Sequence, residues 1–79
     1  MKVQVRLFAA ARERVGQGQL VHELPGGATV GDLAEDLFRL YPGLEKMRLQ
    51  FAVNASYAKE DTVLRDSDEV ACIPPVGGG

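Results

Sequence analysis

Three glycines close the sequence, and the carboxylate of the last glycine is the group best suited to chemistry. Val76, Gly77, Gly78 and Gly79 offer little side-chain surface to a core, and glycine loses more entropy on ordering than any other residue. The six residues from Pro74 to Gly79 would span roughly 20 Å when extended, and without bulky side chains they would thread a narrow channel. If activated as an acyl-adenylate, the Gly79 carboxylate would accept a sulfur or an amine nucleophile. Taken alone, such a terminus also fits a frayed chain end without chemistry.

The sequence contains one cysteine and one histidine, which limits its other chemistry. A single thiol, Cys72, excludes an internal disulfide, a multi-cysteine zinc site and an iron–sulfur cluster. His22 alone cannot form a multi-histidine metal site, and neither Ser56 nor Ser67 lies in a nucleophile-elbow sequence. No cationic residue adjoins Cys72, so we expect a buried and unreactive thiol, and for His22 a solvated or hydrogen-bonded imidazole. We therefore predict no metal site, no tightly bound cofactor and no autonomous enzyme.

Length and charge narrow the possible partners. The 79 residues leave room for one domain with a modest core. Nine lysines and arginines against eleven acidic residues give a net charge of −2, and the basic residues are scattered, which argues against a nucleic-acid partner. No apolar run is long enough to span a membrane. The first residues lack the apolar stretch of a signal peptide, so the cytoplasm is the expected compartment.

Five segments have the alternating or apolar pattern of short strands. In residues 2–7, Val3, Val5 and Leu7 lie on one face, and Phe8 and Ala9 are expected to continue this strand. The other strands are expected at residues 19–24, 50–54, 57–59 and 69–73.

The clearest element is a helix that begins at residue 30. Thr29 is a good N-cap, and Asp32 places a carboxylate in the first turn, where the helix dipole favours it. Apolar residues at helical spacing form one stripe that should face the core: Val30, Leu33, Ala34, Leu37, Phe38 and Tyr41. A shorter helix-permissive stretch covers residues 10–15.

This order of elements predicts an α+β fold. A hairpin, one main helix and two or three further strands are typical of the β-grasp arrangement, in which the helix packs on a mixed sheet of four or five strands. The first and last strands are the most apolar, so we expect them to be central neighbours. We predict a β-grasp domain over residues 1–75 and a flexible C-terminal glycine tail over residues 76–79.

Several short segments together resemble a known family. They are VQVRLFA at residues 3–9, RERVG at 12–16, ATVGDL at 28–33, YP at 41–42, VN at 53–54 and DEVACIPPVGGG at 68–79. This combination resembles the MoaD family, the small, sulfur-carrying subunits of molybdopterin synthase, over essentially the whole chain. The last segment is the most specific part. Gly78 and Gly79 match the family's terminal Gly-Gly pair, while Gly77 stands where a side chain is common.

The resemblance implies a ubiquitin-like β-grasp fold and a sulfur relay. An E1-like adenylating enzyme would place AMP transiently on the Gly79 carboxylate, and a sulfur donor such as a cysteine desulfurase would displace it to leave a thiocarboxylate. The large synthase subunit, in a heterotetramer, would receive the tail through Gly77 and Gly78. It would supply the catalytic side chains that transfer the sulfur to cyclic pyranopterin monophosphate. This chain would then be a non-catalytic sulfur carrier.

The resemblance also suggests where the large subunit docks. The family uses apolar contacts around the first and last strands, so Phe8 and Ile73 are candidates for the docking patch, with Pro75 and Val76 on the way to the tail. An ordinary core position is the alternative for Phe8 and Ile73.

Three other functions remain open at this stage. The first is the sulfur carrier for thiamin thiazole, although those carriers are typically shorter and lack the Pro-Pro-Val approach. The second is a ubiquitin-like modifier conjugated to lysines through Gly79. The third is a β-grasp interaction domain whose tail has no chemistry.

Overall fold

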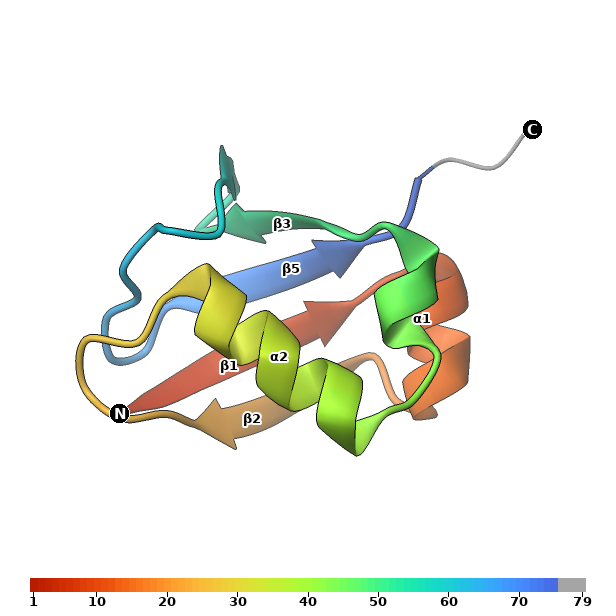
Figure 1. The fold of residues 1–79 in the computed structure, drawn as a ribbon, viewed down its shortest axis with the longest axis horizontal. Coiled ribbons are helices and arrows are strands. Elements are labelled where there is room, and N and C mark those ends of the chain that lie inside the picture. Colours follow the sequence, from red (N-terminus) through yellow and green to blue (C-terminus); the bar gives the residue numbers. More distant parts are fainter. Residues whose placement is uncertain (76–79) are drawn as a thin grey trace.

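A computed structural model describes residues 1–75, which form a five-stranded sheet and three helical segments. In chain order the elements are β1 Lys2–Leu7, α1 Ala9–Val15, β2 Gln19–Glu23, α2 Val30–Leu40, the 3₁₀ helix η1 Leu44–Met47, β3 Gln50–Val53, β4 Ser56–Ala58 and β5 Glu69–Ile73. Figure 1 shows α2 lying across the sheet, with α1 at one end of it.

The strand order in the sheet is β2-β1-β5-β3-β4. The first and last strands, β1 and β5, pair in parallel at its centre, and the other neighbours pair in antiparallel fashion. The first and last strands are therefore central neighbours, as predicted. The α+β β-grasp fold is confirmed as well, with five strands where four or five were expected.

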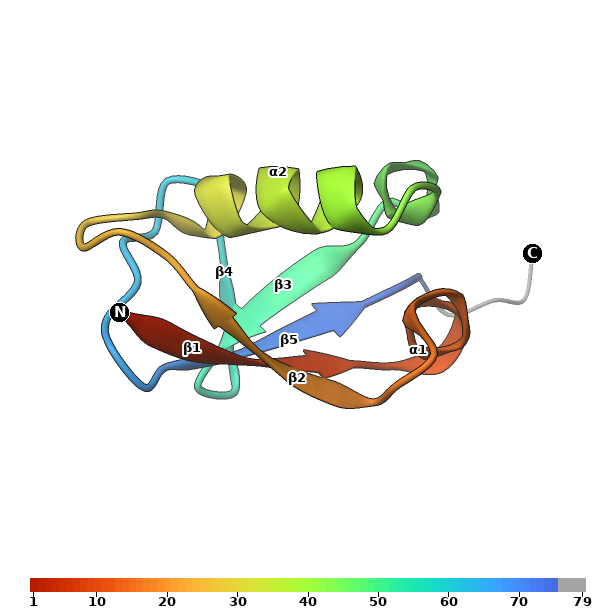
Figure 2. The same cartoon turned by 90° about the horizontal axis from the view of Figure 1, so that it is seen from below.

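Helix α2 covers one face of the sheet and contributes four buried residues to the core: Val30, Leu33, Ala34 and Leu37. Its N-terminus is closed by a capping box, in which the hydroxyl of Thr29 accepts from the Asp32 N–H at 3.2 Å and the Asp32 carboxylate accepts from the Thr29 N–H at 2.9 Å. Within the predicted stripe, Val30, Leu33 and Leu37 are fully buried. Figure 2 shows the helix above the sheet and the opposite sheet face without a helix over it among residues 1–75.

Several predicted boundaries were wrong by one or two residues. Strand β2 ends at Glu23, one residue before its predicted end. The first strand ends at Leu7, and Phe8 is the N-cap of α1 instead of a strand residue. The alanines that follow it favour helix over strand. Leu7 is still joined to the neighbouring chain, since its N–H donates to the Gly18 carbonyl at 2.9 Å. At the end of α2, Tyr41 is the half-buried C-cap of this helix and lies beyond its last turn.

In the β3–β4 hairpin, β3 ends one residue earlier than predicted, and β4 has the predicted length but begins and ends one residue earlier. Asn54 and Ala55 form its two-residue turn, and both have positive φ, 49° and 73°, as the turn favoured by twisted hairpins requires. Register then follows directly, with Val53 opposite Ser56 and Ala52 opposite Tyr57. This register decides which side chains share the sheet face opposite α2.

Candidate functional site

The chain leaves the domain at the end of the central strand. Strand β5 ends at Ile73, opposite Gln50 of β3, and is followed by Pro74 and the exposed Pro75. Since proline cannot donate to a strand ladder, the two prolines end the sheet as predicted. The end of β5 lies at the α1 end of the domain (Figure 1).

The sheet face opposite α2 has a row of small residues at its centre. Pairing sets Arg6 of β1 beside Ala71 of β5, Ala71 beside Ala52 of β3, and Ala52 beside Tyr57 of β4. Side chains opposite each other in a sheet share one face, so two alanines lie between a long cationic side chain and an aromatic one. The alanine pair therefore leaves a depression in the face.

Larger side chains surround this depression and make it a hollow of about 290 Å³. Phe8 is 41% exposed and Tyr57 is 75% exposed, whereas Ile73 is half-buried. The residues that line the hollow are Arg6, Phe8, Ala52, Ala55, Tyr57, Glu69, Ala71 and Ile73. Its walls are apolar apart from one charged pair.

That pair, Arg6 and Glu69, forms an open ion pair. The Nη1 of Arg6 and the Oε1 of Glu69 are 3.8 Å apart, and both side chains are about half exposed, so no hydrogen bond joins them. The guanidinium carbon of Arg6 also lies 5.6 Å from the centre of the Phe8 ring, within the range of a cation–π contact. The stem of Arg6 thus closes the β1 side of the hollow while its charge stays in water.

Two of the four predicted docking residues meet in this hollow. Phe8 and Ile73 both line it, and the exposure of Phe8 excludes an ordinary core position for that ring. Pro75 is exposed beyond it. The fourth, Val76, and the predicted tail residues Gly77, Gly78 and Gly79 lie outside the described residues.

Sequence reasoning missed six lining residues: Arg6, Ala52, Ala55, Tyr57, Glu69 and Ala71. Period-two alternation places Arg6 on the face of Phe8, and Ala71 on that of Ile73, so this signal was present. Ala52 and Tyr57 join the same hollow only through the register between separate strands, which alternation does not give.

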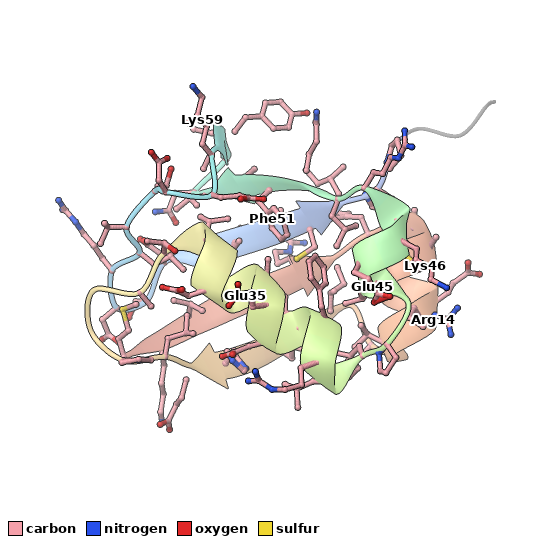
Figure 3. All side chains as sticks on the ribbon, in the orientation of Figure 1. Arg14, Glu35, Glu45, Lys46, Phe51 and Lys59 are labelled. Atoms are coloured by element: carbon pink, nitrogen blue, oxygen red, sulfur yellow. The ribbon has the colours of Figure 1, made fainter. Side chains whose placement is uncertain are left out.

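The thiol of Cys72 points to the opposite face of the sheet. It is fully buried in the core, and burial raises its pKa to about 12. A thiol that stays protonated is a poor nucleophile, so the structural role predicted for Cys72 fits its surroundings. Phe51 pairs with it from β3 and lies on the side of the sheet that faces α2 (Figure 3).

The imidazole of His22 joins strand β2 to helix α2. Its Nε2 donates to the Oδ2 of Asp36 at 2.9 Å, and Arg39 donates to the other oxygen of the same carboxylate at 2.7 Å. The predicted hydrogen-bonded imidazole is confirmed. The His22 hydrogen bond is the largest cause that lowers the pKa of Asp36.

A second group of charged side chains lies where α1 meets η1 (Figure 3). The carboxylate of Glu45 accepts from the Gly43 N–H at 2.9 Å, and this bond lowers its pKa. Arg14 packs against Gly43, whose φ of 106° is left-handed. These contacts close a turn after α2, so the cluster has a structural role.

Within residues 1–75, no three histidine, cysteine or acidic side chains come together as a metal site would require. None of the helices described there is long and apolar enough to cross a membrane.

Known proteins resemble this chain over essentially its whole length. The model of the ThiS family matches residues 5–79. The chain belongs to the ThiS family. Individual relatives are similar over the full length. The molybdopterin synthase sulfur carrier subunit of Mycobacterium tuberculosis is 43% identical to this chain, and the match covers 100% of this chain and 99% of that protein. The corresponding protein of Arabidopsis thaliana is 35% identical, over 100% of this chain and 84% of its own length. The resemblance to sulfur carrier subunits is confirmed.

Solved structures support the fold of this ThiS-family chain. A putative molybdopterin converting factor subunit 1 from Pyrococcus furiosus superposes with a TM-score of 0.89 at 32% identity, covering 96% of this chain and 99% of that one. SAMP1 from Haloferax volcanii gives the same TM-score of 0.89 at 28% identity, with both chains covered completely. The ubiquitin-like β-grasp assignment is therefore secure over the described domain.

Proposed function

We propose that this chain is the sulfur carrier subunit of a molybdopterin synthase. The observation that carries the proposal is the course of the chain at Ile73, Pro74 and Pro75. The central strand ends beside an apolar hollow, and the sequence then continues with Val76 and three glycines. A partner seated on the hollow would receive the glycines directly.

The chemistry of the carrier takes place on the carboxylate of Gly79. This carboxylate attacks the α-phosphorus of ATP in an adenylating enzyme, and pyrophosphate leaves. A sulfur donor at the oxidation level of sulfide then attacks the acyl carbon, AMP leaves, and a thiocarboxylate remains. In the large subunit the thiocarboxylate sulfur forms a bond to a carbon of cyclic pyranopterin monophosphate as an oxygen substituent leaves that carbon, and water then cleaves the acyl–sulfur bond and returns the carboxylate. Two such rounds supply the two sulfurs of the dithiolene.

The features of the described domain suit a carrier more than a catalyst. Its one thiol, Cys72, is buried with a pKa of about 12, and His22 is hydrogen-bonded to Asp36 away from the hollow. The catalytic side chains of the transfer step therefore belong to the large subunit. A related fold occurs in a complex of subunits 1 and 2 of the molybdopterin-converting factor from Helicobacter pylori, at 24% identity and a TM-score of 0.71, which supports a large-subunit partner.

A second candidate is a protein modifier joined to lysines through Gly79. Small archaeal modifier protein 3 of Haloferax volcanii, 34% identical over 100% of both chains, favours this function. Adenylation precedes both fates, so the two differ in the nucleophile that displaces AMP: a sulfur donor for the carrier, a lysine amine for the modifier.

One experiment separates these functions. The full chain is expressed with its adenylating enzyme and sulfur donor, and its intact mass is measured before and after addition of the large subunit and pterin precursor. The carrier predicts a mass gain equal to sulfur replacing oxygen, which disappears as molybdopterin forms. Lysine-linked adducts without that mass gain would support the modifier instead. A chain that gains neither product would contradict both.

A further inference from the structure

We propose that the outer edge of strand β2 pairs with the same edge of a second copy of this chain. The two strands run antiparallel, with Val21 opposite Val21 on a two-fold axis, and they join two sheets into one. Strand β2 does not line the hollow beside the tail. The proposal therefore does not rest on the proposed function.

The outer edge of β2 presents a row of backbone groups that the sheet does not use. Strand β2 is the last strand on its side of the sheet. Leu24 and Met1 exchange two hydrogen bonds, of 2.9 and 2.7 Å, and the register continues this pairing along β1 and β2. Residues of β2 that lie an even number of positions from Leu24 therefore bond to β1. The N–H and C=O groups of the others, which are Gln19, Val21 and Glu23, point outward.

This edge has none of the features that usually keep sheet edges apart. Exposed edges are normally protected by lysine, proline, a bulge or a very short strand. Strand β2 has five residues, its sequence QLVHE contains no lysine or proline, and its pairing with β1 is continuous. The strand at the opposite edge, β4, has only three residues and is followed by Lys59. Of the two edges, β2 is therefore the one open to pairing.

The side chains of β2 are complementary to a second copy in one register. With Val21 opposite itself, Gln19 lies opposite Glu23 on both sides of the axis, so no like charges face each other. Val21 is 57% exposed, and its contact with itself removes apolar surface from water. The Nε2 of Gln19 donates to Gln4 at 2.8 Å, and its second N–H remains for the Glu23 carboxylate. A parallel alignment would instead place Glu23 opposite Glu23.

The same register satisfies the outward backbone groups. Residues 19, 21 and 23 of one strand meet residues 23, 21 and 19 of the other, so each outward N–H meets a C=O of the second copy. The intervening residues form pairs without hydrogen bonds, in which Leu20 lies opposite His22 of the second copy. The Cα atoms of such a pair are about 4.5 Å apart, which gives the register a distinct signature.

An exposed leucine lies on the helix side of the same edge. Leu40 is the last residue of α2 and is 54% exposed. It follows Asp36 by about one helical turn, and Asp36 accepts a hydrogen bond from His22 of β2, so Leu40 lies on the side of α2 that faces β2. In Figure 1 the C-terminal end of α2 is directed toward this edge. A strand added to β2 therefore covers apolar surface on both faces of the sheet, at Val21 and at Leu40.

Pairing through β2 leaves the two tails free. Strand β2 begins and strand β5 ends at the α1 end of the domain (Figure 1). Because the two β2 strands run antiparallel, the two α1 ends lie at opposite ends of the joined sheet. Ile73 and Pro75 of each copy stay open to a partner, so sulfur transfer should not depend on the pairing.

NMR of the full chain, without any other protein, tests the pairing. One strand pair buries a small area, so we expect a Kd of about 0.1 to 1 mM. On dilution, the amide signals of Gln19, Val21 and Glu23 should shift most. In a mixture of isotope-labelled and unlabelled chains, an intermolecular NOE between the Hα atoms of Leu20 and His22 identifies the register. This wild-type measurement decides the proposal even if a variant fails to fold.

Substitution at the axis tests the self-contact. Val21→Lys places two ammonium groups opposite each other and should raise the Kd about fivefold or more. The matched control is Val63→Lys, which adds the same charge at a valine that is 58% exposed and lies outside the strands; its Kd should stay within about twofold of wild type. An equimolar mixture of Val21→Lys and Val21→Glu places opposite charges on the axis and should restore pairing. Thermal melts confirm that each variant folds.

Four results would overturn the proposal. The first is a wild-type spectrum that does not change with concentration up to about 1 mM. The second is an equal loss for Val63→Lys, because added charge anywhere would then weaken association. The third is a mixture of Val21→Lys and Val21→Glu that does not recover pairing, because β2 would then not face itself. The fourth is a shift of the β2 amides only when the adenylating enzyme or the large subunit is added, which would assign the edge to a strand of that protein.

The sulfur carrier function is tested separately, by the intact mass of the chain. A chain that pairs through β2 but gains no sulfur would contradict the proposed function and leave the pairing intact. A chain that gains sulfur but stays monomeric would contradict only the pairing.

Discussion

The backbone N–H of Phe8 donates to the carbonyl of Cys72 at 3.3 Å. This bond joins the start of α1 to the last strand one residue before Ile73, so the Phe8 ring and the Ile73 side chain lie on the same hollow. A buried and unreactive residue, Cys72, thereby helps to place the two side chains that we propose for docking. The chain therefore leaves the domain from the end of the central strand, β5.

The stability of the domain should depend strongly on the buried stripe of α2. Leu37 is fully buried, whereas Leu40 on the same helix is 54% exposed. We expect Leu37→Ala to lower the free energy of unfolding by about 2–5 kcal/mol, because it removes buried methyl groups and leaves a cavity. The measurement is chemical denaturation followed by circular dichroism.

Leu40→Ala is the matched control for this change, with an expected loss within about 0.5 kcal/mol. Equal losses for the two leucines would mean that the stripe does not face the core.

Local patterns predicted most of the fold. Alternation in residues 69–73 gave β5 with its observed bounds, and the Thr29 and Asp32 signals correctly placed the N-terminus of α2. Both rest on interactions within a few residues, where propensity and capping decide the structure. The error at Phe8 also came from a local pattern. An apolar residue that follows a strand can either continue that strand or become the N-cap of a helix.

The candidate site was predicted only in part. Phe8 and Ile73 could be named because the family resemblance pointed to the first and last strands. Ala52 and Ala71, in contrast, come together only through the pairing between β5, β3 and β4. Such pairing is non-local, and a shift of one residue would turn Ala52 to the other face. The turn at Asn54 and Ala55 sets this register, and its positive φ values are not evident from the residue types alone, since alanine rarely adopts them.

Alkaline pH should destabilise the domain through Cys72. Burial raises its pKa to about 12, above the value of about 8.5 in an unfolded chain. The folded state therefore keeps a proton that the unfolded state loses, so this contribution is complete below about pH 8.5 and falls as the pH rises toward 12. Melting temperatures from about pH 8 to pH 11 should decrease more steeply for wild type than for Cys72→Ala.

Parallel melting curves for the two proteins would contradict this assignment. Cys72→Ala should also transfer sulfur normally, because the proposed chemistry uses the carboxylate of Gly79 and no internal thiol. A folded variant that accepts sulfur but forms no molybdopterin would show that Cys72 takes part in the transfer.

Acid should loosen the contact between β2 and α2 through Asp36. Hydrogen bonds from His22 and then Arg39 lower the pKa of Asp36, against the opposing effect of burial. A carboxyl with a lowered folded pKa stabilises the domain above its unfolded value of about 3.9, and this contribution disappears as the pH falls through the folded value. The melting temperatures of wild type and Asp36→Asn should differ at neutral pH and converge as the pH falls well below the unfolded value of about 3.9.

Glu35→Gln is the control for Asp36→Asn, because Glu35 is an exposed carboxylate on the same helix (Figure 3). Its melting temperature should follow that of wild type across the same pH range. A difference between wild type and Asp36→Asn that persists in acid would show that the carboxylate charge is not the source of the stability.

Deletion of Gly79 should abolish sulfur transfer and leave folding unchanged. The deletion shortens the reach of the tail by about 3.5 Å, and a displacement of about 1 Å already costs about a hundredfold in rate where reacting groups must be aligned. The deletion leaves the buried core described within residues 1–75 unchanged in sequence, so the melting temperature should stay the same. Gly78→Leu keeps the full length but adds a side chain that obstructs a narrow channel. It should block molybdopterin formation, and Gly26→Leu serves as its control, since a Cβ at Gly26 meets no atom within 4 Å.

Acyl-adenylate and molybdopterin are measured separately for each variant. Normal molybdopterin formation by the chain without Gly79 would show that the terminal carboxylate does not carry the sulfur, and the proposed function would fall with it.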